Sequence, residues 1–114
     1  MPGEEMLLET GMGVDLHGGD VTKAATRAVE DATRRVSLLF LRTLSRRRSV
    51  KVSIDVTVGV PNPEAVDVAA LTANLPVGRA FVRCEPGGLT QTLDNGERVV
   101  IAVAAIVVRV EGGQ

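Results

Sequence analysis

The chain has no tryptophan, no tyrosine and only two phenylalanines among its 114 residues. Its core must therefore be built from valine, leucine, isoleucine and alanine, which bury less area per side chain than aromatic residues do. Because small domains are already marginally stable, burial between subunits would supply what such a core lacks. We therefore expect a single domain over residues 1–114, and we expect it to form a homo-oligomer.

The chain also has a single cysteine, nearly equal numbers of basic and acidic residues, and no long apolar run. The only cysteine, Cys84, excludes a disulfide within the chain, which is typical of a reducing compartment. The acidic start lacks the apolar segment of a secretory signal, and no apolar run reaches the roughly 18 residues that a membrane span needs. A net charge of −1 gives no overall field that favours nucleic acid. We expect a soluble, cytoplasmic protein that binds neither membrane nor nucleic acid.

Two segments have the pattern of helices. From residue 21 onward, apolar residues recur with a period of 3.6 and charged residues take the opposite face. Asp20 is a suitable N-cap for this helix, which we expect to end near residues 45–49. A short second helix is predicted over residues 64–74, with Asn62 as its cap and Pro63 at its first position.

Four segments have the pattern of strands. Residues 50–60 alternate strictly between apolar and polar, and residues 6–13 form a first strand that breaks at glycines. Residues 78–91 form a third strand, interrupted by Pro86-Gly87-Gly88, where two glycines suggest a bulge or a loop that passes close to a ligand. Residues 99–110 are almost wholly apolar, which indicates a strand covered on both sides, with another subunit as one candidate cover.

The order of these elements is strand, helix, strand, short helix, strand and strand. This order predicts an α+β domain in which helices pack on one face of a four-stranded sheet. A ferredoxin-like arrangement is the near alternative.

The richest concentration of chemistry surrounds the only histidine, His17, because residues 11–20 read Gly-Met-Gly-Val-Asp-Leu-His-Gly-Gly-Asp. On an extended backbone, Asp15 and His17 would point to one face and could together chelate a divalent metal such as zinc or manganese. The chain has no second histidine, so a third ligand would have to come from another carboxylate or another subunit. The carboxylates that could serve are Glu9, Asp20 and Asp55.

Acid–base chemistry and anion binding are the other functional interpretations of this segment. His17 would carry the proton, with Asp15 orienting it or acting alone. The amides of Gly18, Gly19 and the first helical turn would bind an anionic group, helped by the helix dipole. These two interpretations are compatible.

The remaining members of the predicted ligand-binding set are Gly11, Gly13 and Asp20. The structural alternative is that the glycines only permit a tight strand-to-helix turn and Asp20 only caps the helix. His17 would then hydrogen-bond nearby backbone.

Residues 9–18, which read Glu-Thr-Gly-Met-Gly-Val-Asp-Leu-His-Gly, and the following residues 20–25 resemble a family of small bacterial conserved hypothetical proteins. That family also occurs in plants with a long extension, and its hallmark is the segment G-x-G-x-D-x-H-G. The resemblance extends through residues 58–64 and so covers most of the chain. The resemblance implies a shared fold and a shared motif. It implies no reaction, because the family has no established activity.

Residues 11–17 are also similar to the metal-binding start of methylerythritol cyclodiphosphate synthase, which has a chorismate-mutase-like fold with the same order of elements. This distant similarity implies that Asp15 and His17 are metal ligands. It also implies a trimer, or a multiple of one, with sites between subunits. The enzyme supplies another histidine after its motif, and this chain has none.

Together these observations predict a conserved protein with a small-molecule site between subunits, formed by Asp15, His17 and the turn of Gly18, Gly19 and Asp20. Catalysis there would be hydrolase-like or lyase-like chemistry on a small polar or anionic substrate. The alternative is a non-catalytic ligand-binding or purely structural homo-oligomer.

Overall fold

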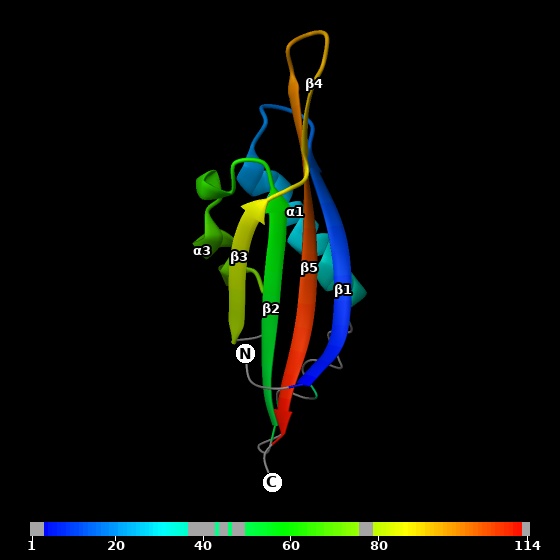
Figure 1. The fold of residues 1–114 in the computed structure, drawn as a ribbon, viewed down its shortest axis with the longest axis vertical. Coiled ribbons are helices and arrows are strands. Elements are labelled where there is room, and N and C mark those ends of the chain that lie inside the picture. The colour runs from blue at the N-terminus through cyan, green and yellow to red at the C-terminus, as the bar shows by residue number, and fades with distance from the viewer. Residues whose placement is uncertain (1–3, 37–42, 44–45, 47–49, 76–78, 113–114) are drawn as a thin grey trace.

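The computed structural model describes residues 4–36, 43, 46, 50–75 and 79–112. It is an elongated α+β structure with extents of 59 × 23 × 20 Å (Figure 1). Its elements are, in order, β1 (Glu4–Asp15), α1 (Val21–Arg35), β2 (Val50–Val60), the 3-10 turn η1 (Pro63–Ala65), α3 (Val68–Ala73), β3 (Ala80–Pro86), β4 (Leu89–Thr92) and β5 (Arg98–Gly112).

The strands form one mixed sheet in the order β1-β5-β2-β3. The last strand, β5, is central and runs antiparallel to both β1 and β2, whereas β2 and β3 are parallel. Helix α1 lies behind the sheet in Figure 1 and packs on β1, β5 and β2, whereas α3 lies at the left, beside β3, on which it packs. Helices on one face of the sheet are therefore as the sequence predicts.

The core between α1 and the sheet consists of small aliphatic side chains. Among the described residues, the buried hydrophobic side chains are all alanine, valine, isoleucine or leucine, as the lack of aromatics requires. The helix contributes mainly alanines to this core: Ala24, Ala25, Ala28 and Ala32 are fully buried. Because alanine side chains are short, the backbone of α1 can lie close to the backbone of β1.

Gly11 and Gly13 complete this close approach from the side of the strand. A Cβ atom at Gly13 would lie less than 3.0 Å from the backbone of Ala24 and Ala28, and one at Gly11 would lie equally close to the backbone of Ala28 and Ala32. Real Cβ atoms essentially never make contacts this short. The first two glycines of the motif therefore have a packing role beneath α1.

The predicted four-stranded sheet is wrong in one respect, because the predicted strand over residues 78–91 is two strands. β3 pairs with β2, but after Gly87 and Gly88 the chain moves sideways and continues as β4 beside β5. Along β5, β2 is the neighbour of the C-terminal part, down to Val103. β4 is the neighbour of the N-terminal part, from Arg98 to Ile101. The double glycine permits this change of neighbour, since Gly88 has a φ of +63°.

The helices are shorter than predicted. α1 ends at Arg35 because Val36 takes an extended backbone, with φ −85° and ψ 131°, and donates its N–H to the Thr33 carbonyl. Most of the predicted continuation to residues 45–49 lies outside the described residues. The single helix predicted over residues 64–74 is instead η1 followed by the shorter helix α3, whose N-cap is Asp67.

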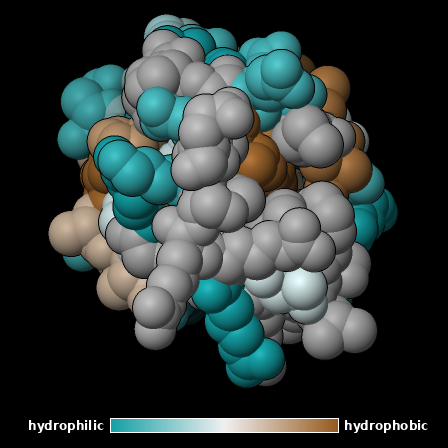
Figure 2. Space-filling view, turned by 90° about the horizontal axis from the view of Figure 1, so that it is seen from below, coloured by the Kyte–Doolittle hydropathy of each residue, from teal (hydrophilic) through white to brown (hydrophobic). Residues whose placement is uncertain are grey.

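The face of the sheet opposite the helices is open, in that no described element packs over it. Four large apolar side chains are well exposed there: Leu8 (61%), Met12 (57%), Phe81 (45%) and Val103 (46%). The view along the long axis, from the end opposite the β4–β5 hairpin, shows described hydrophilic and hydrophobic side chains together at the surface (Figure 2). Within the described ranges, no helix is both long enough and apolar enough to cross a membrane.

Candidate functional site

The glycine-rich segment forms the turn between β1 and α1. β1 ends at Asp15, and Gly18 and Gly19 have positive φ values of 84° and 64°. His17 therefore lies in the turn and not on an extended strand. The predicted placement of Asp15 and His17 on one face of a strand does not hold, because the strand has already ended.

Both carboxylate oxygens of Asp15 have partners that stabilise this turn. Its side chain is buried, with the residue 4% exposed, and its Oδ2 atom accepts the backbone N–H of Asp20 at 2.8 Å. Its other oxygen, Oδ1, lies 3.6 Å from a guanidinium nitrogen of Arg27 on α1. A buried carboxylate needs such partners, because moving a carboxylate from water into the protein without a partner costs several kcal/mol. In this structure, Asp15 holds the turn that carries His17.

The carboxylate partner of His17 is Glu97. The Nδ1 atom of His17 lies 2.7 Å from Oε2 of Glu97, which immediately precedes β5. Glu97 is itself held by Asn95, whose amide donates to Oε1 at 3.1 Å and whose Oδ1 accepts the Glu97 backbone N–H at 2.9 Å. The His17 side chain is 82% exposed, so its other ring nitrogen is open to solvent.

Sequence reasoning missed Glu97 as a site residue, since 80 positions separate it from His17. The available signal is the sequence Asp94-Asn95-Gly96, which is typical of a tight turn between two strands. That turn ends a hairpin and places the next residue beside the β1–α1 turn only once the register of β1 with β5 is known.

The end of α1 that would bind an anion is already occupied by carboxylates. Asp20 caps the helix by accepting the backbone N–H of Lys23 at 3.1 Å, and its own N–H is donated to Asp15. Two acidic side chains at a helix N-terminus interact favourably with the helix dipole. Besides Arg27, which faces Asp15, the turn has Arg98 beside it, whose guanidinium carbon would lie 3.8 Å from a Cβ atom built on Gly19.

A shallow cavity of about 310 Å³ lies between the turn and the hairpin. The residues that line it are Gly18, Asn95, Gly96, Glu97 and Arg98. Gly18 is the one residue of the predicted ligand-binding set on this surface, while Gly11 and Gly13 lie under α1.

A metal site within one chain is not formed by the residues we predicted. Nowhere in the described parts of the chain do three or more histidine, cysteine, aspartate or glutamate side chains gather closely enough to hold an ion. The third ligand proposed from Glu9, Asp20 or Asp55 therefore does not join Asp15 and His17 in one copy. A third ligand from another subunit stays a prediction.

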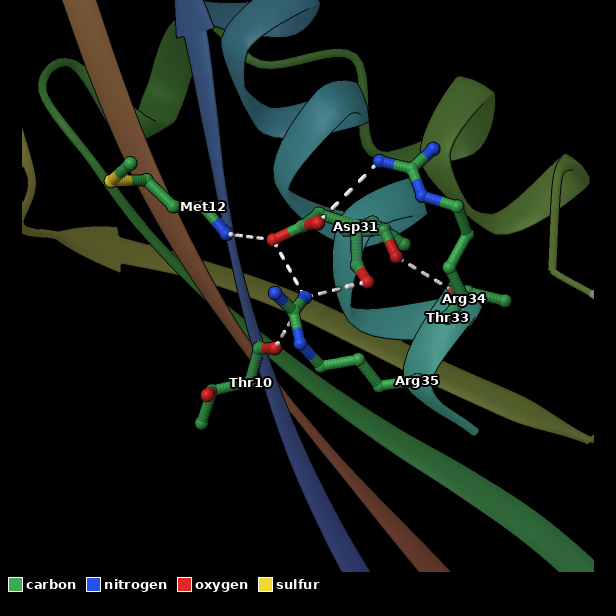
Figure 3. Close-up of polar contacts among 7 residues, drawn as sticks. Thr10, Met12, Asp31, Thr33, Arg34 and Arg35 are labelled. Atoms are coloured by element: carbon green, nitrogen blue, oxygen red, sulfur yellow. Dashed lines mark hydrogen bonds and ion pairs between the residues drawn. The ribbon is translucent and has the colours of Figure 1, made fainter. Parts of the chain in front are cut away.

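A second polar cluster lies at the outer edge of β1 (Figure 3). The Asp31 carboxylate on α1 accepts the backbone N–H of Met12 at 2.9 Å and pairs with Arg35 at 2.8 Å and with Arg34 at 3.5 Å. Arg35 also donates to the carbonyl of Thr10 at 3.3 Å. The Met12 amide and, after it, the Arg35 guanidinium lower the pKa of Asp31 below its ordinary value.

This lowered pKa makes Asp31 a source of acid-sensitive stability. We expect Asp31→Asn to lower Tm at pH 7, because the ionised form is the one that the Met12 amide and Arg35 stabilise. A carboxyl whose folded pKa is lowered contributes stability above its unfolded pKa and loses it as the pH falls through the folded value. The gap in Tm between parent and variant should therefore narrow as the pH falls below 3.8.

Calorimetry between pH 7 and pH 2.5 measures this gap. Glu30→Gln, which removes an exposed carboxyl one residue earlier on the same helix, is the matched control. A gap for Asp31→Asn that is constant across this range would contradict the assignment.

Residues 5–108 match the model of a family described as "Conserved hypothetical protein (Lin0512_fam)". The chain belongs to this family. The resemblance to a conserved hypothetical family, predicted from the sequence, is thereby confirmed. No curated protein matches the chain.

A solved structure shares the fold along almost the whole chain of this family member. It is a crystal structure from Nostoc punctiforme, described as an FtsZ-like protein of unknown function. Its chain is 31% identical, the match covers 99% of each chain, and the TM-score is 0.75. Neither description assigns an activity.

Proposed function

We propose that this chain is a cytoplasmic small-molecule-binding protein whose site lies between the β1–α1 turn and the β4–β5 hairpin, with His17 as its acid–base group. The observation that carries this proposal is the contact of 2.7 Å between Nδ1 of His17 and Oε2 of Glu97. The single cysteine supports the reducing compartment.

A carboxylate on Nδ1 organises the imidazole for proton transfer. Glu97 accepts from the Nδ1–H group, which fixes the tautomer and leaves Nε2 to accept or release a proton on the solvent side. The Asn95 side chain donates to the Glu97 carboxylate and accepts from the Glu97 backbone N–H, so the carboxylate does not have to be ordered when substrate arrives. Asp15 acts as a positioning residue, since it fixes the turn that carries His17.

The chemistry of the cavity favours a small anionic or polar substrate. Arg98 lines the cavity and offers a planar guanidinium, which suits carboxylate and phosphate groups. A proton donor and acceptor beside a bound anion is the arrangement that hydrolase-like or lyase-like reactions use. If zinc or manganese binds here, Nε2 of His17 is the atom that would ligate it, because Nδ1 is already held by a carboxylate.

The assembly and the finer fold assignment are part of this proposal. We propose a homo-oligomer, for which the distant similarity implies a trimer or a multiple of one (of these, a multiple such as six copies also has room for two-fold contacts), and a chorismate-mutase-like arrangement of the sheet. The aliphatic composition of the core supports self-association. Helices on one face of the sheet support the fold assignment, although β4 adds a strand to the predicted order of elements.

The experiment uses the only histidine as a probe. Protein labelled with ¹⁵N in the histidine ring is titrated with inorganic phosphate, and the ring signals are followed by NMR. We expect saturable shifts in the parent and their loss in Arg98→Ala. Arg83→Ala, which removes an exposed arginine on β3, is the matched control and should leave the titration unchanged. The absence of any saturable shift in the parent would contradict an anion site beside His17.

His17→Ala separates a site residue from a structural one. Because the side chain is 82% exposed, we expect its removal to change stability by no more than about 0.5 kcal/mol. Phosphate binding, measured in this variant by calorimetry, should be lost. A variant that melts several degrees lower and still binds phosphate would assign His17 a structural role.

A non-catalytic homo-oligomer is the second candidate function. The observation that favours it is the open face of the sheet, where Leu8, Met12, Phe81 and Val103 are exposed. Met12 and Val103 are direct neighbours in the β1–β5 register, and exposed apolar side chains on an open sheet face are typical of surfaces that another chain covers. In this case His17 variants would bind and assemble like the parent.

A further inference from the structure

We propose that two copies of this chain join through their β3 strands, which pair antiparallel about Val82 and so continue one sheet across both copies. This proposal does not rest on the function assigned to His17. Its origin is the difference between the two outer strands of the sheet, β1 and β3.

Between Thr10 and Val14, the edge at β1 is closed by side chains from α1. Arg27 donates to the Val14 carbonyl at 2.6 Å, Asp31 accepts from the Met12 amide, and Arg35 donates to the Thr10 carbonyl. These three helix residues are four positions apart and so lie on one face of α1. They occupy three of the backbone groups that another strand would need over this half of β1, which is a way to prevent pairing at an edge.

The edge at β3 has no such cover in the described part of the chain. The carbonyl of Arg79 accepts from the Ile54 amide, and the Gly87 amide donates to the Val60 carbonyl, so odd-numbered residues of this segment bond toward β2. Because bonding direction alternates along a strand, the backbone groups of residues 80, 82 and 84 point outward. Those groups form no hydrogen bond with any described residue.

Antiparallel pairing centred on Val82 uses every one of these outward groups. Val82 would lie opposite Val82 of the second copy, and Ala80 would lie opposite Cys84. Each of these pairs exchanges two backbone hydrogen bonds. The two-fold symmetry is that of the commonest homo-oligomers, in which each contact occurs twice.

The same register also matches the side chains on the open face. Arg79 would lie opposite Glu85 of the second copy, which gives an opposite-charge pair on each side of the axis. Phe81, 45% exposed in one copy, would lie opposite Arg83, so that a guanidinium covers an aromatic ring. A register shifted by two residues would lose the Arg79–Glu85 match. The charges of this strand therefore complement a second copy of itself.

Cross-linking tests the register directly. In Val82→Cys combined with Cys84→Ala, the one thiol of each copy would face its counterpart at about 5.5 Å between Cα atoms, which a disulfide spans. We expect this variant to form a disulfide-linked dimer under mild oxidation. The parent, whose Cys84 would face Ala80, should not, and neither should Thr10→Cys with Cys84→Ala on the closed edge. Failure of the Val82→Cys variant to cross-link, or equal cross-linking at Thr10, would overturn the proposal.

The mass in solution provides a second, independent test. We expect sedimentation to show that Glu85→Arg weakens association roughly tenfold, since it places like charges opposite each other twice. Combining it with Arg79→Glu should restore association to near the parent level, because the pairs are exchanged. A parent that is monomeric at about 100 µM, where complexes in the micromolar range form, or charge variants that associate like the parent, would overturn the proposal.

Discussion

Gly13→Ala is expected to lower the free energy of unfolding by about 3 kcal/mol or more, at the upper end of what overpacked cores lose. The added Cβ atom would lie less than 3.0 Å from the backbone of both Ala24 and Ala28. Backbone cannot rotate away as a side chain can, so relief requires α1 to move off β1. That movement would loosen the packing of the buried alanines against the strand.

Chemical denaturation and calorimetry measure this loss, which should lower Tm by more than about 10 °C in a domain of this size. Gly18→Ala is the matched control, because a Cβ atom there would meet nothing within 4 Å. With a φ of +84° at Gly18, the control should cost only the roughly 1–2 kcal/mol of left-handed backbone. Equal losses in the two variants would show that α1 does not pack on β1 as described.

Gly88→Ala is expected to have the other large effect, centred on the hairpin. Its Cβ atom would lie less than 3.0 Å from the carbonyl oxygen of Ile101, and its φ of +63° adds the strain of left-handed backbone. Gly88 stands where the chain leaves β2 and joins β5, so the clash falls on the first pair of the β4–β5 ladder. We expect β4 to detach while the rest of the sheet persists.

Hydrogen exchange of the β4 amides, together with Tm, checks this outcome. Gly96→Ala is the control, because Gly96 has a similar φ of +88° but open space around a built Cβ atom. Faster exchange in β4 for Gly88→Ala than for Gly96→Ala would isolate the clash from the backbone strain. Identical exchange in both would mean that the Ile101 carbonyl moves aside at little cost.

Detachment of β4 also has a consequence for the site. Glu97 and Asn95 belong to the turn of that hairpin, so His17 would lose the support of its carboxylate. In Gly88→Ala, the ring signals of His17 should therefore move toward those of an exposed histidine without a partner. Loss of phosphate binding would accompany this change if the proposed site is correct.

The spacing of apolar residues predicted those helices and strands in which one spacing continues through the whole element. Strict alternation predicted β2 with its observed bounds of residues 50–60, and the helical stripe after Asp20 predicted the start of α1. The end of α1 was not predictable in this way, because the apolar pattern continues past Val36 although its backbone is extended. β4 was also missed. The chain changes its neighbouring strand at Gly87 and Gly88, and such a change does not alter the alternation of apolar and polar residues.

The site was predicted only as far as its location. A segment of glycines, an acid and a histidine looks the same whether the glycines leave room for a ligand or for a helix. At Gly11 and Gly13, the space is filled by the backbone of helix α1. The partner of His17 depends on the register between the first and last strands, which no local pattern of residues records.

The central position of β5 also governs when this protein can fold. Glu4 pairs with Val110, so the first strand has no partner until the last strand has been synthesised. β2 pairs with the same strand, and the sheet therefore cannot be completed before β5 is made. Contacts over such long sequence separations are typical of slow folding. Until β5 is made, the apolar faces of β1 and β2 lack their central strand, and exposed surface of this kind makes an incomplete chain prone to aggregation.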